Sequence, residues 1–233
     1  MYNNSSNMTT KNKNGYLEII IGPMFASKTT RLLEIYSQCE FCNIPVVVIN
    51  HSSDKRYDDV MLSTHDKRMI PCIQSDNIMD IINHKQQNSI RMIEKIKTEF
   101  SDKNVEIDID IINKKQSDFM KEHMLYKNAD VVLINEGQFF PDLYDAVEIM
   151  LNDKKHIYIC GLDGDFQRKK FGQILDLIPL CDKVIKLTSL CSICKDGTPA
   201  IFSMRLTNEK VQTLIGSDNY IPVCRKCYET NCD

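Results

Sequence analysis

The chain of 233 residues lacks any apolar run long enough to cross a lipid bilayer, which argues against a membrane-spanning helix. It also lacks a basic excess, because 29 Lys and Arg residues face 32 Asp and Glu residues, for a formal net charge of −3. A protein that grips a nucleic-acid backbone usually carries a basic face. We therefore expect neither a membrane nor long nucleic acid as a partner, whereas a small anionic substrate is compatible with this charge.

A secretion signal is missing as well. Residues 1–14 are polar and have no apolar segment of the kind that signal peptides contain, so we expect a disordered arm. Beyond this arm the sequence has no low-complexity tract and no internal repeat. The chain has ten cysteines, and without a secretion signal we expect metal ligands or buried thiols in the cytoplasm rather than disulfides.

Four short apolar segments rich in β-branched residues predict buried strands at 17–21, 45–49, 131–134 and 157–160. Between the first two, residues 29–42 carry apolar side chains at helical spacing, so the chain opens strand, loop, helix, strand. That order predicts an α/β fold with a parallel sheet flanked by helices, like that of P-loop NTPases. In open parallel sheets the ligand binds beyond the carboxyl ends of the strands, and we expect the functional residues there.

The pattern also divides the chain into parts. Hydrophobic residues make up 42% of the chain, enough for one sizeable core, which we assign to residues 15–189. Within it, about 83–127 reads as a surface elaboration, with a helix marked by apolar residues at 90–100 and a strand at 105–111, where Val and Ile alternate with acids. Residues 190–233 carry paired cysteines and weak periodicity, which predicts a small metal-held domain.

The stretch from Gly22 to Thr29 resembles a phosphate-binding loop. In the pattern Gly-x-x-x-x-Gly-Lys-Ser/Thr, placed between a strand and a helix, backbone N–H groups cradle phosphates. Gly22, Lys28 and Thr29 occupy the expected positions, where Lys reaches the transferring phosphate and the hydroxyl holds Mg²⁺. Ser27 stands where the second Gly is expected. Because Gly lets the backbone approach a phosphate without a Cβ, we expect weakened binding.

A second signal follows the strand at 131–134. In P-loop enzymes the strand beside the loop usually ends in an Asp that supports Mg²⁺, and here that place holds Asn135, which brings no charge. Glu136 comes next and is expected to face the nucleotide pocket. Its carboxylate could accept the proton of an attacking hydroxyl, or it could take over the support of the metal.

Two Cys-x-x-Cys pairs, Cys191 with Cys194 and Cys224 with Cys227, suit a tetrahedral Zn²⁺ with no open position, which indicates a structural site. A redox motif is the other option for such cysteines, but a redox pair normally comes singly. Cys39 and Cys42 form a third pair. They fall late in the expected helix, and we interpret them as core or partly buried thiols.

Taken together, these motifs resemble the type II thymidine kinases, a family that includes the cellular cytosolic enzyme and many enzymes of large DNA viruses. The matching stretches cover nearly the whole chain apart from the arm and the middle elaboration: 22–25, 28–29, 54–57, 64–66, 136–142, 162–169, 184–188 and both cysteine pairs. The resemblance implies transfer of the γ-phosphate of ATP to the 5′-hydroxyl of thymidine. It also implies Mg²⁺ and a structural Zn²⁺.

The resemblance further implies roles for individual residues. Glu136 matches the catalytic base of the family. Contacts to ATP and Mg²⁺ are implied for Gly22, Pro23, Met24, Phe25, Ala26, Ser27, Lys28, Thr29, Asp54, Arg56, Asn135 and Gln138. Contacts to thymidine are implied for Met24, Phe139, Leu162, Phe166, Phe171, Leu214, Ile215, Gly216 and Tyr220. The last four belong to a lasso-like loop that closes over the nucleoside and that the zinc site staples at its base.

The sequence departs from the family at two places, where the family has Gly at position 27 and Asp at position 135. Both concern ATP and Mg²⁺, not thymidine. A second hypothesis is therefore a catalytically weakened protein that binds thymidine or dTTP as a sensor. A third is a zinc-ribbon ATPase acting on nucleic acid, against which the net charge argues. The resemblance also implies feedback inhibition by dTTP and a homo-oligomer, either a tetramer or a dimer.

Overall fold

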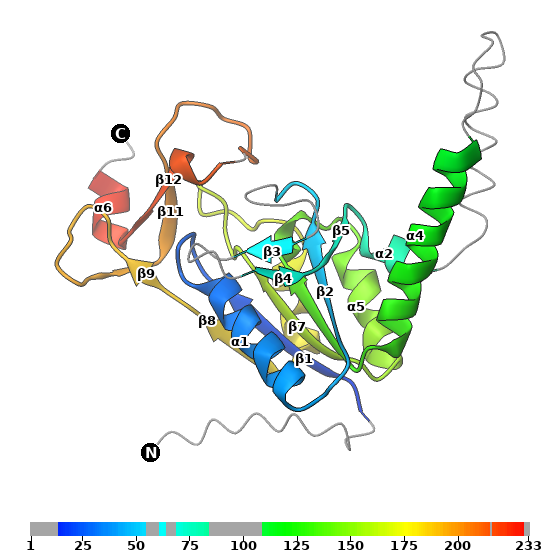
Figure 1. Ribbon diagram of the computed structural model, residues 1–233. Helices are drawn as coiled ribbons and strands as arrows, with labels where there is room; N and C mark the ends of the chain where they lie inside the picture. Colours follow the sequence, from blue (N-terminus) through cyan, green and yellow to red (C-terminus); the bar gives the residue numbers. More distant parts are fainter. Residues whose placement is uncertain (1–13, 55–60, 64–68, 84–108, 215, 231–233) are drawn as a thin grey trace, which may run out of the picture.

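The computed structural model describes residues 14–54, 61–63, 69–83, 109–214 and 216–230 (Figure 1). The expected arm at 1–14 therefore lies outside the described residues except for its last position. Arg56, Ile215 and the expected helix at 90–100 also lie outside them. Among the helices that are described, none combines the length and the apolar character needed to cross a membrane.

A six-stranded sheet forms the centre of the molecule, in the order β5-β2-β6-β7-β1-β8. Every neighbouring pair in it is parallel. Its strands are β1 (Tyr16–Ile21), β2 (Val46–His51), β5 (Ile73–Ser75), β6 (Val131–Asn135), β7 (His156–Gly161) and β8 (Lys183–Lys186). The four strands predicted from apolar runs are confirmed, and with them the parallel α/β fold.

The order of the strands was not predicted. β7 lies between β6 and β1, yet Asn135 at the end of β6 still reaches the loop after β1, because its Oδ1 accepts from the Thr29 hydroxyl at 3.4 Å. Strands of a parallel sheet are buried on both faces, so each appears in the sequence as a similar continuous apolar run. Such a run identifies a strand but does not show which strands are its neighbours in the sheet. The strand order is a property of the packed tertiary structure.

Helices cover both faces of the sheet (Figure 1). On one face α1 (Lys28–Phe41) buries Leu32, Leu33, Ile35 and Cys39 against residues such as Ile20. The other face is covered by α2 (Ile78–Ile82), α4 (Ile109–Asn128), α5 (Leu143–Asn152) and the 3₁₀ segment η2 (Ile174–Leu180). Successive residues of a strand point to opposite faces, so Ile19 and Ile20 belong to different cores.

The helix α4 overturns part of the expected middle elaboration. Residues 109–111, which we assigned to a strand, are the first residues of this helix, while 105–108 lie outside the described residues. An alternation of a few residues is a weak signal. The following run of Lys, Met, Leu and Glu favours a helix, which forms cooperatively once it is long enough. At its far end the buried Tyr126 donates to Asp153 at 2.8 Å, which ties α4 to the end of α5.

Cys39 and Cys42 differ in their surroundings. Cys39 lies on the buried face of α1, as expected. Cys42 is exposed, so its assignment to the core is wrong. The physical reason is that α1 ends at Phe41, and Cys42 therefore leaves the helical face that Cys39 shares with the core.

The C-terminal unit, defined here as residues 189–230, lies beyond the carboxyl end of β8 (Figure 1). In it β9 (Ser189–Leu190) pairs with β10 (Pro199–Ala200), and β11 (Phe202–Arg205) pairs with β12 (Tyr220–Val223). The 3₁₀ segment η3 (Ser217–Asn219) precedes β12, and α6 (Arg225–Thr230) follows it. The unit has a small core of its own that includes the four paired cysteines. Elsewhere, β3 (Met61–Ser63) and β4 (Met69–Pro71) form a separate antiparallel pair.

Candidate active site

The loop from Gly22 to Thr29 connects β1 to α1, which is the context that a phosphate-binding loop requires. Ser27 immediately precedes the helix, with φ 59° and ψ 27° in the left-handed region. Non-glycine residues reach that region at a cost of about 1–2 kcal/mol, because Cβ crowds the next carbonyl. The structure thus gives a backbone reason why glycine suits position 27, in addition to the close approach of a phosphate.

Two contacts hold the loop in its present shape. The ammonium of Lys28 is buried and donates to the carbonyl of Pro23 at 2.7 Å. The backbone N–H of Met24 donates to the hydroxyl of Ser203 at 2.9 Å. Ser203 lies on β11, so the loop touches the C-terminal unit directly. A single serine so far along the chain carries no sequence signal, and sequence reasoning missed it.

A polar network lies at the carboxyl ends of β2, β6 and β7. The fully buried Asn135 donates through Nδ2 to Asn50 at 2.8 Å and to the Asp54 carboxylate at 3.4 Å. Its Oδ1 accepts from the Cys160 thiol at 3.0 Å and from the Thr29 hydroxyl at 3.4 Å. The network therefore brings Asp54, which lies three residues after the end of β2, beside the uncharged Asn135 at the end of β6. Sequence reasoning placed functional residues after Ile49 but did not single out Asn50.

Glu136 follows directly and is half-buried, with φ 53°. Strained backbone of this kind clusters at functional sites. The amide of Gln138 donates to Oε2 of Glu136 at 2.7 Å, and Gln138 Oε1 accepts the N–H of Leu162 at 2.9 Å. Gln138 is only 3% exposed and fills the space above Gly161, where a Cβ would lie 2.4 Å from Gln138 Oε1. The structure thus places Gln138 behind Glu136, as a bridge between β6 and β7.

Aromatic residues lie beside this carboxylate. Phe139 and Phe171 meet edge to face with ring centres 5.4 Å apart, as expected for two residues of one apolar wall. The turn after Phe171 needs Gly172, because φ is +60° and a Cβ would lie 2.0 Å from the Gln138 carbonyl oxygen. The His51 ring packs against the Phe139 ring, with 5.4 Å between the ring centres. Burial lowers the pKa of His51, although Asp76 and other acids oppose the shift, so a neutral imidazole is favoured at this wall.

The remaining predicted nucleoside contacts form a second group at the C-terminal unit. The hydroxyl of the buried Tyr220 donates to the carbonyl of Leu214 at 3.1 Å. Phe166, on the loop after β7, lies under the guanidinium of Arg205, with 3.7 Å between the guanidinium carbon and the ring centre. Gly216 is exposed. Sequence reasoning did not identify Arg205, because an isolated arginine in a short strand has no distinguishing pattern.

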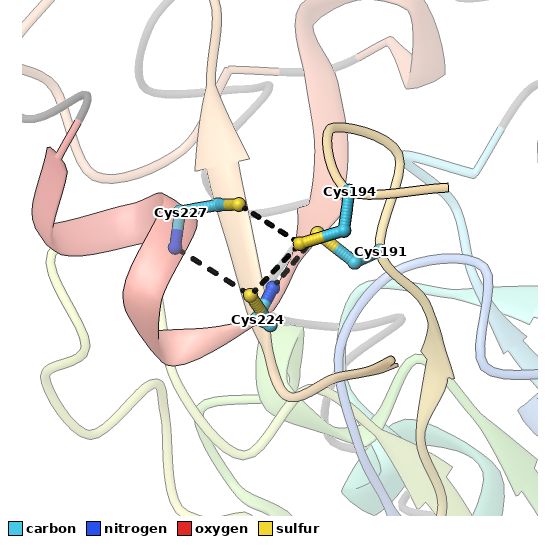
Figure 2. Close-up of side chains that lie close together, drawn as sticks. All are labelled: Cys191, Cys194, Cys224 and Cys227. Atoms are coloured by element: carbon cyan, nitrogen blue, oxygen red, sulfur yellow. Dashed lines mark hydrogen bonds between the residues drawn. The ribbon is translucent and has the colours of Figure 1, made fainter. Parts of the chain in front are cut away.

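The four paired cysteines converge in the C-terminal unit, as predicted, with all four sulfur atoms within 4.8 Å of one another. Figure 2 shows them approaching from the turn after β9 and from the end of β12 with α6. Cys194 Sγ lies 3.7 Å from Cys224 Sγ and 3.2 Å from Cys227 Sγ. Zinc–sulfur bonds of about 2.3 Å set tetrahedral edges of about 3.8 Å, so the cluster is consistent with structural zinc.

The electrostatics of the cluster favour at least one thiolate. Burial opposes ionisation of Cys191, but N–H groups of Cys194, Cys224 and Ile193 outweigh it and lower the pKa of the Cys191 thiol to about 6. Zinc binds thiolates, not thiols. The donor set and its geometry therefore fit a closed four-sulfur site.

Comparison with known proteins gives one family. A family model described as thymidine kinase matches residues 15–107 and 93–228. The thymidine kinase of Variola virus is 36% identical over 215 residues, which cover 92% of this chain and 97% of that protein. The thymidine kinase of Yaba monkey tumor virus (strain VR587) is 33% identical over 217 residues, or 93% of this chain and 96% of that protein. That of Vaccinia virus (strain Ankara) is 35% identical over 92% of this chain and 97% of that protein.

Among solved structures, a DNA replication initiation factor aligns with 74% of this chain and 40% of that chain, with a TM-score of 0.38 and 10% identity. These values support no statement about shared activity.

Proposed function

This chain belongs to the thymidine kinase family, and we propose on that basis that it transfers the γ-phosphate of ATP to the 5′-hydroxyl of thymidine. The observation that carries the proposal is the match to that family over nearly the whole chain, which includes every candidate site residue. The chain is thus an ATP-dependent phosphotransferase, and thymidine and ATP are its substrates.

The loop at 22–29 is the proposed phosphate site. We propose that Lys28 exchanges its bond to the Pro23 carbonyl for an oxygen of the transferring phosphate when ATP binds. The loop backbone and the start of α1 supply N–H groups to the other phosphates. Phe25, Ala26 and Ser27 form the turn that aims those N–H groups.

The donors near Thr29 fit Mg²⁺, which prefers hard oxygen ligands. Thr29 Oγ1, Asn135 Oδ1 and the Asp54 carboxylate are the oxygen atoms that the network brings together. When bound, Mg²⁺ would offset the negative charge of the phosphates. We propose that Asp54 supplies the carboxylate that position 135 lacks, and that Arg56, two residues later in the sequence, also faces the phosphates.

Glu136 is the proposed general base. Its carboxylate would accept the proton of the thymidine 5′-hydroxyl as the oxygen attacks phosphorus. The bond from Gln138 at 2.7 Å holds Oε2 and so fixes the orientation of the carboxylate. Gln138 is therefore proposed as a positioning residue rather than an ATP contact.

The proposed thymidine site is built from two walls. Met24, Phe139, Leu162 and Phe171 would hold the ring and its methyl group, since apolar walls exclude water and suit a methylated pyrimidine. Phe166 from the loop after β7, together with Tyr220 and residues 214–216 of the C-terminal unit, would close over the nucleoside. Closure of this kind protects ATP from hydrolysis and orients the attacking oxygen.

Replacing Glu136 with glutamine tests the assignment. The amide oxygen of the introduced side chain can still accept from Gln138, so the fold should persist while the base is lost. We expect kcat to fall by about 10²–10⁴-fold, with Kd for thymidine and ATP within about twofold of wild type. Glu148→Gln on the exposed face of α5 is the matched control and should leave kcat unchanged. Unchanged turnover in Glu136→Gln would remove Glu136 from its role.

A second candidate function is a weakened kinase that mainly binds thymidine or dTTP. It is favoured by the left-handed backbone at Ser27 and by the uncharged Asn135. Wild-type protein that binds thymidine but forms no thymidine monophosphate from radiolabelled ATP would support it over the kinase. Feedback inhibition by dTTP and a homo-oligomer of two or four chains remain part of the proposal through family membership.

A further inference from the structure

The lasso, defined here as residues 206–219, is the segment of the C-terminal unit that connects β11 to β12. The two strands run antiparallel, and the lasso emerges where Arg205 faces Tyr220. At the opposite end of the same strand pair Phe202 faces Val223, and Cys224 of the four-cysteine cluster follows directly. The cluster therefore holds one end of the strand pair, and the lasso leaves from the other end.

Arg205 closes the lasso at that other end. Its guanidinium donates to three lasso carbonyls, which belong to Glu209 (2.8 Å), Val211 (2.5 Å) and Gln212 (2.9 Å). It also donates to the Tyr220 hydroxyl at 2.6 Å, and that hydroxyl donates to the carbonyl of Leu214. Hydrogen bonds from a charged donor are stronger than those between neutral groups. The path of the lasso from 209 to 214 is thus set by one side chain and its tyrosine partner.

The same side chain seats the lasso on the loop after β7. The guanidinium carbon of Arg205 lies 3.7 Å from the centre of the Phe166 ring, and Arg205 is only 9% exposed. A second contact with this loop is the hydrogen bond that the Gln212 side-chain amide donates to the Asp165 carboxylate at 2.8 Å. A cation over an aromatic face interacts more strongly when water is excluded, as it is here. Phe166 is one of the residues proposed to close over thymidine, so the lasso and this wall are aligned through Arg205.

Arginine is suited to this position because its donors form a planar fork that can bond several carbonyls and stack on a ring at once. Lysine carries the same charge but is a point donor without a plane. Four acceptors and a ring face surround the guanidinium of Arg205, and an ammonium could not satisfy them together.

We infer that Arg205 is a positioning residue for nucleoside binding, which fixes the path of the lasso and seats it on Phe166 independently of the metal cluster. The inference rests on the proposed function, since the lasso is the element proposed to cover thymidine. Arg205 acts through the lasso and does not itself contact the nucleoside.

The test compares Arg205→Gln and Arg205→Lys with Arg168→Gln in the full-length zinc-loaded protein. Arg168 is a matched control, because its guanidinium carbon also lies over an aromatic ring, 4.5 Å from the centre of Tyr228, and the other contacts of its side chain are with Phe202 and Glu229, which lie outside the lasso. Endoproteinase Lys-C reports on the lasso by cleaving after Lys210, and neither glutamine variant changes a lysine. Zinc stoichiometry and the Kd values for thymidine and ATP complete the measurement.

We expect Arg205→Gln to be cleaved after Lys210 at least tenfold faster than wild type and to bind thymidine at least tenfold more weakly. Its zinc content and ATP affinity should match wild type, and Arg168→Gln should match wild type in cleavage. Arg205→Lys adds a lysine of its own, so it is compared by thymidine affinity alone, which should lie close to that of Arg205→Gln. If Arg205→Gln is cleaved at the wild-type rate and binds thymidine with wild-type affinity, the inference is overturned. Wild-type thymidine affinity in Arg205→Lys would also overturn it, and so would loss of zinc from both Arg205→Gln and Arg205→Lys.

The outcome for the proposed function is separate. If Arg205→Gln is cleaved faster than wild type, the role of Arg205 in the lasso is supported. If the wild-type protein does not bind thymidine, the proposed substrate is refuted whatever the cleavage rates are.

Discussion

Replacing Asn135 with aspartate introduces the residue that the resemblance to thymidine kinases implies at this position, and it also sets two carboxylates side by side. Asn135 Nδ2 lies 3.4 Å from the Asp54 carboxylate and 2.8 Å from the Asn50 carbonyl oxygen. A carboxylate oxygen in place of Nδ2 can donate to neither. Without metal, the substitution therefore removes two hydrogen bonds and adds repulsion between like charges.

The magnitude follows from the distance. Two unit charges about 3.4 Å apart repel by about 5 kcal/mol at an effective dielectric constant of about 20, and by about 1 kcal/mol in water. Asp54 is half-buried, so the repulsion lies between these limits. Protonation of one carboxyl of the pair sets a ceiling of about 4 kcal/mol at pH 7, from the usual aspartate pKa of about 3.9. We expect the free energy of unfolding to fall by about 1–4 kcal/mol.

The expected pH dependence has a definite sign. Two adjacent carboxylates hold a shared proton more tightly in the folded chain than in the unfolded chain, so the folded-state pKa of the pair is raised. A raised acid pKa adds stability as the pH falls. The deficit of Asn135→Asp relative to wild type should therefore be largest at pH 7 and should shrink towards pH 5.

The assay is thermal unfolding with and without Mg²⁺ and ATP. Without ligand, Asn135→Asp should melt about 2–4 °C lower for each kcal/mol lost. Because a bound divalent cation would offset the charge of both carboxylates, Mg²⁺ and ATP should raise the Tm of Asn135→Asp by more than they raise that of wild type. The double variant Asp54→Asn with Asn135→Asp should recover most of the lost stability without ligand. If Asn135→Asp is as stable as wild type at pH 7, Asp54 does not share this site and the reasoning fails.

Two further predictions concern the loop and the cysteine cluster. Ser27→Gly removes the cost of holding a non-glycine residue in the left-handed region at φ 59°. Because unfolded glycine has a larger conformational entropy, the net gain in the free energy of unfolding should be up to about 1.5 kcal/mol, and ATP should bind more tightly. A lower midpoint of urea unfolding would contradict this prediction. Cys194→Ser removes one of four clustered sulfur atoms and should release zinc, measured by atomic absorption, whereas Cys42→Ser, at an exposed thiol outside the cluster, should retain it. Zinc retained at wild-type stoichiometry by Cys194→Ser would refute the four-sulfur site.

The parts of this protein that sequence predicts well are those with a strong local signal. Short apolar runs that are rich in β-branched residues, such as 131–134, favour buried strands, and the loop at Gly22 is recognised by its position between a strand and a helix. The cysteine pairs are also a local signal, because a spacing of two residues lets both thiols of a pair reach one metal ion. The strand at 105–111 failed at residues 109–111 because a short alternation competes with a helix that depends on residues further along.

By itself, the sequence determined the α/β class, the loop at 22–29 between a strand and a helix, the carboxylate at Glu136 and the two cysteine pairs, since each depends on residues a few positions apart. Only the tertiary structure decided the strand order, the approach of Asp54 to Asn135, the hydrogen bond between Gln138 and Leu162, and the closure of the lasso by Arg205 on Phe166. These contacts join residues brought together by packing, and no local pattern marks them. The departure at position 135 illustrates the difference: the sequence shows a missing charge, and the fold shows which neighbouring carboxylate lies beside it.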